Sequence, residues 1–319
     1  MSMSLVTVSV AQIAYLSGNI GRDLSFDLSL GEASTSFNRR LPAGQTVNLS
    51  QPMGQFTVAA GLLPLSGFAR VVERDPVYSE AGQSPIAWTL DGQVDGAQQT
   101  SVQVTVFEQG GRNEGESAIF RITLRADVLA TTRFVPETED GWLRVRSSAT
   151  NKIFSLPSTT EVQVTEISNG REHFFIKEGA YRGTRASVQN AGGRLSLFSA
   201  TDPRLPTARL QYSTGKRLLT VKGQVFRAVD DPQTPWTNGL YDVELPDAPH
   251  GGGLHYSDAR KGRTWFRIGH RGDRYLHTGS ASLGCITITE QKRWDLLYSL
   301  LSPCRKGDGV SVGVLEVVA

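Results

Sequence analysis

The chain has 319 residues, more than one ordinary hydrophobic core needs, which predicts two or three domains. A hydrophobic fraction of 39% and a charged fraction of 20% are typical of a soluble globular protein. The net charge of +2, with lysine and arginine scattered along the chain, argues against a nucleic-acid partner. No run approaches the ~20 apolar residues of a membrane-spanning helix, and the first residues lack the basic and apolar regions of a signal peptide.

Residues 1–130 are predicted to form a β-sandwich. The segments "LVTVSVAQIAYL", "SVQVTVFEQ" and "SAIFRITLRADV" alternate apolar and polar residues, so that Val102, Val104 and Val106 share one face. Turn-rich segments such as "LDGQVDGAQQ" separate these runs. The pattern resembles that of C2-like sandwich modules, which implies a binding or targeting role for this region.

Residues 131–204 are predicted to form a second, smaller β region. Short strands are expected at "GWLRVRSS", "EVQVTEIS", "EHFFIKEG" and "RLSLFS". The segment "SLPSTTEVQV" resembles the loop-then-strand pattern of small SH3-like barrels. An extension that packs on the C-terminal domain fits the same pattern, and both interpretations stay open.

Residues 205–319 are predicted to form a third domain with several strands and the one main helix of a mostly β chain. "ARLQYSTGKRLLTVKGQVFRAV" contains strands broken by "STGK" and "KG", and "GVSVGVLEVV" reads as a closing strand. Trp294, Leu297 and Leu301 recur at helical spacing. Thr287 and Glu290 have the spacing of a capping box, which predicts the start of this helix.

The segment "YLHTGSASLGCITIT" contains Cys285, one of two cysteines, and His277 eight positions before it. Gly284 lets the backbone turn tightly, and amides beside the cysteine can stabilise an oxyanion. A turn through "GSAS" would bring the strand of His277 beside Cys285, where an imidazole can activate a thiol. The residues alone leave three interpretations open: a nucleophile with its base, an inert buried thiol, or a disulfide with Cys304.

Four segments in order resemble the L,D-transpeptidase (YkuD-like) catalytic domain. They are "LQYSTGKRLLTVKGQ", "DDPQTPWTNGLYDVEL", "HTG" and "SLGC", and the resemblance covers residues 205–319. Members of this family carry a cysteine in a Ser/Thr-x-Gly-Cys segment and an upstream His-Gly. The resemblance implies that Cys285 is the nucleophile, that His277 is the base, and that no cofactor is needed.

The sequence also departs from the family pattern. Leu283 replaces a histidine that is common before Gly-Cys, and "GCITIT" lacks an arginine that many members carry after the cysteine. The spacing from His277 to Cys285 is short, which is similar to L,D-transpeptidase-like interbacterial effectors. His270 in "IGHRG" is the alternative base, because its spacing to Cys285 is closer to the usual one.

Further site residues follow from their position near these motifs. Ser282 either orients the imidazole and lines the oxyanion site or closes its own turn. Contacts with substrate are expected at the rim of the cleft, from His255, Tyr256, Arg267 and Gly279. A cationic side chain such as Arg267 could hold a carboxylate of the substrate. No HExxH or CxxC spacing is present, so no metal is expected.

The resemblance implies an L,D-transpeptidase that acts on peptidoglycan tetrapeptide stems through a thioester acyl-enzyme. The outcome would be cross-linking, D-amino acid exchange or L,D-carboxypeptidase trimming. A second hypothesis is a non-catalytic envelope- or glycan-binding protein, or a secretion-particle component, that uses the N-terminal sandwich. The substrate implies action in the periplasm or cell envelope, and the lack of a leader suggests export by a specialised secretion system that the N-terminal domain contacts.

Overall fold

The computed structural model describes residues 3–74, 79–109, 114–190 and 195–319. The chain divides into two compact units, unit 1 (Met1–Thr131) and unit 2 (Thr132–Ala319). Strands dominate both units, and one α-helix, α1 (Trp294–Leu301), is found among the described residues, which confirms the predicted mostly β fold. None of the helices in the described ranges is long and apolar enough for a membrane span.

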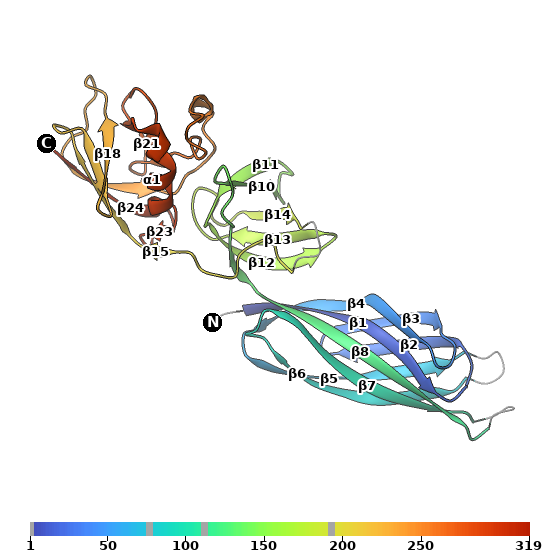
Figure 1. Cartoon of the computed structure of the whole chain (residues 1–319). Helices are drawn as coiled ribbons and strands as arrows, with labels where there is room; N and C mark the ends of the chain where they lie inside the picture. Colours follow the sequence, from blue (N-terminus) through green and yellow to red (C-terminus); the bar gives the residue numbers. More distant parts are fainter. Residues whose placement is uncertain (1–2, 75–78, 110–113, 191–194) are drawn as a thin grey trace. The chain divides into compact units, whose positions relative to one another are not determined.

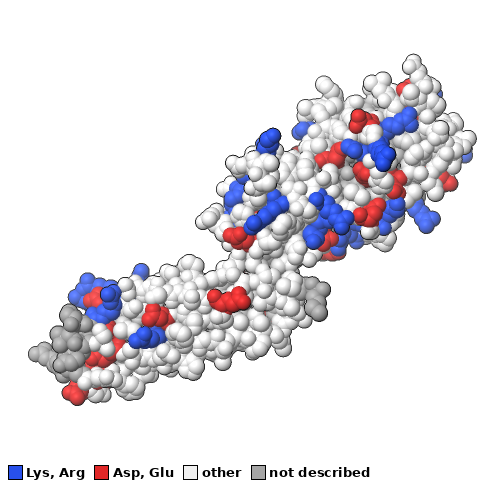
Figure 2. Space-filling view, turned by 180° about the vertical axis from the view of Figure 1, so that it is seen from behind, with Lys and Arg blue, Asp and Glu red and all other residues white. Residues whose placement is uncertain are grey.

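Unit 1 consists of two four-stranded antiparallel sheets, with strand orders β4-β1-β8-β7 and β3-β2-β5-β6 (Figure 1). Apolar side chains from both sheets form one buried core between them. Figure 2 shows that much of the visible surface of this unit carries neither acidic nor basic side chains. The strands are β1 (Met3–Ser17), β2 (Asp23–Leu30), β3 (Ala33–Arg40), β4 (Thr46–Ala59), β5 (Leu62–Glu73), β6 (Ala81–Asp91), β7 (Gly96–Phe107) and β8 (Ser117–Ala130).

The period-two alternation correctly predicted strands in unit 1. The three quoted apolar-polar runs coincide with β1, β7 and β8. Val104 and Val106 are fully buried, and Val102 packs against the same core, so these side chains share one face as predicted. The opposite face of the same strands carries polar side chains, because alternate residues of a strand point to opposite faces.

The first part of unit 2 is a six-stranded antiparallel sheet with the order β11-β10-β14-β13-β12-β9. Three predicted strands are confirmed as β10, β12 and β13, but "RLSLFS" is not a strand: its described part makes only an isolated bridge from Ser199 to Phe134. The buried Glu172 carboxylate accepts hydrogen bonds from the hydroxyl of Ser196 and the amide of Leu197, which fixes this segment as a loop. The strands are β9 (Thr132–Phe134), β10 (Trp142–Ser147), β11 (Ile153–Pro157), β12 (Glu161–Ser168), β13 (Arg171–Ile176) and β14 (Arg185–Gln189).

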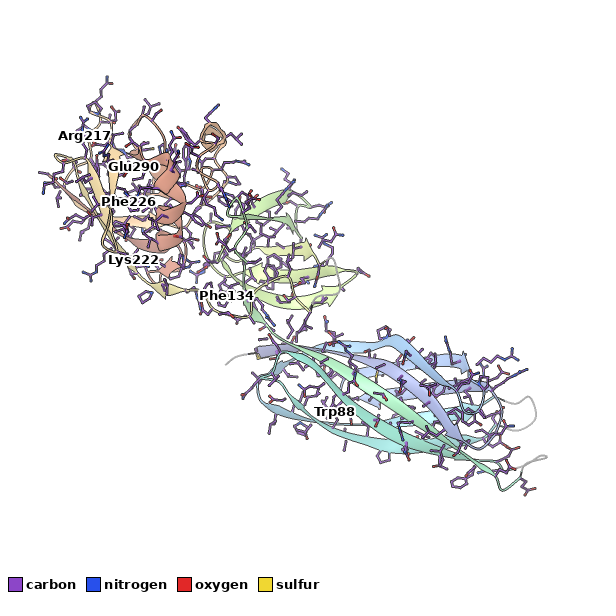
Figure 3. All side chains as sticks on the ribbon, in the orientation of Figure 1. Trp88, Phe134, Arg217, Lys222, Phe226 and Glu290 are labelled. Carbon is purple, nitrogen blue, oxygen red and sulfur yellow. The ribbon has the colours of Figure 1, made fainter. Side chains whose placement is uncertain are left out.

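The rest of unit 2 is built on an eight-stranded sheet with the order β19-β24-β16-β17-β18-β22-β21-β20. The predicted turn "KG" joins β17 to β18 through Lys222 and Gly223, both with positive φ as a two-residue hairpin requires (Figure 3). The strands are β15 (Leu205–Pro206), β16 (Ala208–Ser213), β17 (Leu218–Val221), β18 (Gln224–Val229), β19 (Gly239–Glu244), β20 (Phe266–Arg267), β21 (Tyr275–Thr278), β22 (Ile286–Ile288), β23 (Cys304–Arg305) and β24 (Ser311–Val318).

Helix α1 packs its apolar side on this sheet. Its spacing was predicted correctly, and three of its buried side chains are Trp294, Leu297 and Leu301. The predicted capping box is wrong. Thr287 lies within β22, and Glu290 precedes a short 3-10 turn, η2 (Gln291–Arg293), without capping it through its side chain. The Glu290 carboxylate instead accepts a hydrogen bond of 2.7 Å from the amide of Arg227, which ties the turn to β18.

Candidate active site

The candidate site lies on two neighbouring parallel strands, β21 and β22. Leu276 pairs with Ile286, and His277 pairs with Thr287. The chain returns from one strand to the other through residues 279–285, a shorter connection than the dozen or more residues that usually join parallel strands. The loop therefore presents Cys285 at the very start of β22.

The register places the candidate base on one face of this strand pair, and the candidate nucleophile directly precedes β22. Paired residues share a face, and so do alternate residues along a strand. Thr287 therefore lies on the face of His277, whereas Leu276 and Ile286 on the other face belong to the buried core. Cys285 meets the neighbouring strand through the backbone amide of Tyr275, two residues before His277 on β21.

His277 is held as a neutral imidazole with one nitrogen available. Its Nδ1 lies 2.7 Å from the carbonyl oxygen of Thr278, which can only accept, so Nδ1 carries the proton. Its Nε2 lies 3.2 Å from the Thr287 hydroxyl, whose single proton is shared between Nε2 and the carbonyl oxygen of Ala281, also at 3.2 Å. Burial lowers the pKa of His277, against the opposing effect of the hydrogen bond to Thr278. Nε2 is thus the lone pair that could take a proton.

Trp265 lies between two histidine rings on this face. Its ring stacks on His277 with centroids 4.3 Å apart and on His250 with centroids 4.3 Å apart. The indole Nε1 donates to the carbonyl oxygen of Gly262 at 2.9 Å, which fixes the ring plane. The stack with Trp265 restrains the plane of the His277 imidazole, and the hydrogen bond to Thr278 restrains the position of Nδ1.

Asp247 holds the outer part of this arrangement together. It contacts Nε2 of His250 at 3.1 Å and accepts from Nη2 of Arg267 at 2.6 Å. Burial would raise the pKa of the Asp247 carboxyl, but its bonds and charge interactions with these two side chains outweigh burial and lower it to about 2. Arg267, predicted to hold a substrate carboxylate, is already paired with Asp247 and with the Tyr275 hydroxyl at 3.1 Å.

The Cys285 thiol is buried against the start of β21. Its Sγ accepts from the amide of Tyr275 at 3.4 Å and lies 3.9 Å from the carbonyl oxygen of Asp273. Burial raises the pKa of this thiol, and the Tyr275 amide and the charge of Arg274 oppose that rise. Within the described ranges no hydrogen bond joins Sγ to an imidazole, and the raised pKa that burial produces favours the protonated thiol.

The loop before Cys285 has a defined conformation. Gly284 has φ of +95°, a left-handed conformation that favours glycine. The Ser282 hydroxyl donates to the carbonyl oxygen of Cys285 at 2.6 Å, so of its two predicted roles it closes the turn in this structure. Leu283, at the tip, is 96% exposed. A methyl group on Gly279 would lie 2.9 Å from both the Thr287 methyl and the Tyr256 hydroxyl.

The other predicted side chains occupy different surroundings. His270 is exposed, and its two nitrogens contact Glu244 at 2.6 Å and Asp242 at 2.8 Å. The hydrogen bond to Glu244 raises the pKa of His270 most, and the hydrogen bond to Asp242 adds to the rise. The raised pKa favours a charged ring without a free lone pair. His255 is exposed at the end of η1 (Gly251–His255), and neither histidine contacts Cys285 among the described residues.

Both cysteines are free thiols, so the predicted alternative of a disulfide is wrong for this structure. Cys304 is buried beneath α1 and donates to the carbonyl oxygen of Leu300 at 3.2 Å. Across the described parts of the chain, no group of three or more histidine, cysteine or acidic side chains is arranged to hold a metal ion. The Cys285 thiol contacts backbone groups of Tyr275 and Asp273, and the His277 imidazole is on the adjacent strand β21.

Sequence reasoning missed the partners of His277. Thr287 was assigned to a helix cap, and Asp247 and Trp265 were given no role in the site. Alternation in "TWFRI" could have revealed that Trp265 and Arg267 point away from the buried Phe266. No local pattern identifies Asp247, because it meets Arg267 from a distant segment of the chain.

No known protein-family model matches the sequence, and the chain has no significant match among curated proteins. The resemblance to L,D-transpeptidases therefore rests on the motifs in the sequence. The local geometry around Cys285 and His277 stands beside those motifs as a separate observation.

Proposed function

We propose that the C-terminal region is a cysteine-dependent L,D-transpeptidase-like acyltransferase that acts on peptidoglycan tetrapeptide stems. The observation that supports the proposal is the pairing of β21 with β22, which carries His277 on one strand and Cys285 immediately before the other. The stem peptide as substrate comes from the motif resemblance. It implies action in the periplasm or cell envelope, and delivery by a specialised secretion system through unit 1 belongs to the same proposal.

In the proposed reaction, Nε2 of His277 takes the proton of the Cys285 thiol. Sγ bonds to the carbonyl carbon that precedes the terminal D-residue, and amides at Gly284 and Cys285 stabilise the oxyanion. The C–N bond to the D-residue then breaks, the imidazolium gives its proton to the leaving amine, and a thioester remains. An amine acceptor yields a cross-link or an exchanged D-residue, and water yields a trimmed stem.

The reaction requires the resting site to rearrange, because Sγ of Cys285 accepts a hydrogen bond from the Tyr275 amide and must turn toward Nε2 of His277. The Thr287 hydroxyl occupies Nε2 of His277, and the raised pKa of the buried Cys285 thiol, a consequence of its burial, keeps the proton on sulfur. Catalytic hydrogen bonds often tighten only when substrate is bound. In the proposal, the substrate displaces the Thr287 hydroxyl, and the thiol proton moves as sulfur attacks.

The same resting geometry favours a second candidate function. A thiol with a raised pKa and without an imidazole partner among the described residues is typical of an inert buried cysteine. The chain would then be a non-catalytic envelope- or glycan-binding protein, or a secretion-particle component, that works through unit 1. The accessible chemistry of Cys285 separates the two candidates.

The deciding experiment is mass spectrometry of the full chain incubated with purified tetrapeptide muropeptides. Wild type is compared with Cys285→Ala, and Cys304→Ala is the matched control for loss of a buried thiol. We expect an acyl adduct or loss of the terminal D-residue with wild type and Cys304→Ala only. A folded wild-type protein with no adduct and no turnover would reject the acyltransferase and support the binding function.

A further inference from the structure

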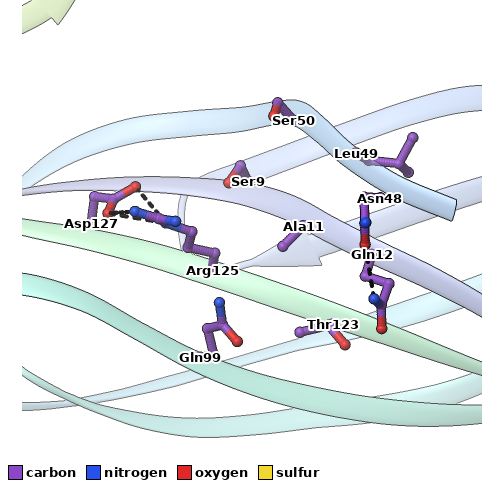
Figure 4. Close-up of a pocket in the computed structure, with 10 residues that line it drawn as sticks. All are labelled: Ser9, Ala11, Gln12, Asn48, Leu49, Ser50, Gln99, Thr123, Arg125 and Asp127. Atoms are coloured by element: carbon purple, nitrogen blue, oxygen red, sulfur yellow. Dashed lines mark hydrogen bonds and ion pairs between the residues drawn. The ribbon is translucent and has the colours of Figure 1, made fainter. Parts of the chain in front are cut away.

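The outward face of sheet β4-β1-β8-β7 in unit 1 contains a hollow of about 550 Å³ (Figure 4). This volume falls within the ~300–1,000 Å³ of typical small-molecule sites. Side chains from all four strands of the sheet line it. The hollow is built entirely within unit 1 and does not involve Cys285.

The hollow exists because β1 is irregular at this point. The register of β1 shifts between Val10 and Gln12 against both neighbouring strands: Ala11 is an extra residue against β8, whereas Leu49 and Ser50 of β4 together lie opposite Ala11. A β-bulge of this kind redirects side chains and bends the strand locally. The methyl group of Ala11 fills little of the space that the bulge opens.

The lining offers hydrogen bonds that the protein itself does not use. Ser9, Ser50, Gln99 and Thr123 line the hollow, and their side chains make no hydrogen bond with the described residues. Hydroxyl and amide side chains both donate and accept. Nearby, Nε2 of Gln12 donates to Oδ1 of Asn48 at 2.9 Å, which leaves the remaining amide groups of this pair available.

The charges in the lining cancel each other. Arg125 and Asp127 are its only charged side chains, and Arg125 donates to Asp127 at 2.8 and 3.0 Å (Figure 4). An anionic or cationic ligand would have to break this pair, whereas a neutral ligand would not. Ala11 and Leu49 add a small apolar surface beside the polar groups.

We propose that unit 1 binds a neutral oligosaccharide in this hollow. A sugar presents many hydroxyls that donate and accept, apolar C–H faces and no charge, which matches the free side chains, the apolar patch and the self-paired ions of the lining. The proposal does not depend on the acyltransferase function, because it uses other residues in the other unit.

The test is calorimetric titration of the full chain with chitotetraose, as an amino-sugar backbone, and with cellotetraose, as a plain hexose polymer. The test variant is Gln99→Ala with Thr123→Val. Its matched control is Gln83→Ala with Thr89→Val, the same chemistry on exposed positions of β6 in the other sheet. We expect the test variant to weaken binding about tenfold or more, and the control to leave it unchanged.

Binding of chitotetraose alone would identify an amino-sugar ligand, and binding of cellotetraose alone a hexose polymer; either supports the proposal. Affinity should also be nearly independent of salt, because no net charge is involved. The proposal is overturned if neither sugar binds the folded protein, or if test and control variants bind equally. A steep loss of affinity with salt would overturn it as well. Far-ultraviolet circular dichroism of both variants checks that the sheet is intact.

Discussion

The outward sheet face of unit 1 and the face of β21 and β22 that carries His277 differ in exposure to solvent, because His277 and Thr287 on the second face are buried. The hollow in unit 1 is open, and its lining carries neutral side chains with free hydrogen-bonding groups. The face of β21 and β22 lies beneath Trp265, which stacks on His277. Burial lowers the pKa of His277 and raises that of Cys285. The same period-two alternation thus yields an open polar lining in one place and a buried face with shifted pKa values in the other.

The largest expected effect separates the two faces completely. Cys285→Ala should abolish acyl transfer, because no other group on its face can form the thioester. It should leave oligosaccharide binding by unit 1 unchanged. Mass spectrometry of the acyl adduct and calorimetry with the two sugars give the two readouts. If Cys285→Ala kept full turnover on muropeptides, the proposed chemistry of this face would be wrong.

Replacing histidines should sharpen the assignment of the base. His277→Gln keeps a hydrogen-bonding side chain but removes the proton acceptor, and we expect kcat/KM to fall about 10²- to 10⁴-fold. His270→Gln is the matched control, because His270 sits in an exposed ion-pair cluster. It should change kcat/KM less than about twofold, since exposed ion pairs contribute little. The opposite pattern in steady-state kinetics would assign the base to His270.

A methyl group at position 279 should disturb the covered face. Gly279→Ala would drive its Cβ against the Thr287 methyl and the Tyr256 hydroxyl, each at 2.9 Å. We expect the free energy of unfolding to fall by about 1–3 kcal/mol, as for other overpacked sites. Gly251→Ala is the control, because its Cβ meets nothing within 4 Å. Urea denaturation measures both, and equal stability of the two variants would contradict the packing argument.

The smallest expected effect is an opposite pH dependence of stability from the two histidines. Burial lowers the folded pKa of His277, so its contribution is complete above about pH 6.5 and is lost as pH falls through the lowered value. Hydrogen bonds to Glu244 and Asp242 raise the folded pKa of His270, so its contribution is complete below about pH 6.5 and is lost as pH rises. The effect of His270 is small because its side chain is 53% exposed.

Urea titrations of His277→Gln and His270→Gln across pH 5–8 check these signs. His277→Gln should lose less unfolding free energy than wild type as pH falls. The difference in unfolding free energy between wild type and His270→Gln should become smaller as pH rises. Oligosaccharide binding should stay constant over the same range, because the hollow contains no histidine. If the loss of unfolding free energy relative to wild type changed with pH in the same direction in both variants, the proposed difference between the buried and the exposed histidine would be wrong.

Much of the fold could be predicted from the sequence because it depends on local patterns. The alternation of Val102, Val104 and Val106 and the helical spacing from Trp294 to Leu301 each report one buried side of one element. The strand expected at "RLSLFS" and the capping box were wrong because tertiary contacts decided them. The buried Glu172 carboxylate accepts a hydrogen bond from the amide of Leu197 in "RLSLFS". The Glu290 carboxylate accepts one from the amide of Arg227 in β18 instead of capping the helix.

The candidate site could be predicted only in part, for a similar reason. The proximity of His277 and Cys285 in the sequence suggested adjacent strands, and the structure has His277 on β21 and Cys285 directly before the adjacent β22. The ring stack of His250, Trp265 and His277 joins three segments, and Asp247 meets Arg267 across twenty positions. Such contacts depend on how segments meet in three dimensions, which spacing within one segment does not determine.

The short return between β21 and β22 has a consequence for the order of folding. His277 and Thr287 pair across only ten positions, whereas β16 and β24 pair Ala208 with Gly313, which encloses more than a hundred residues. Closing a short loop costs less chain entropy than closing a long one. We expect the strand pair that carries Cys285 to form before the sheet closes, which pulse-labelled hydrogen exchange would detect as earlier protection of β22 than of β24.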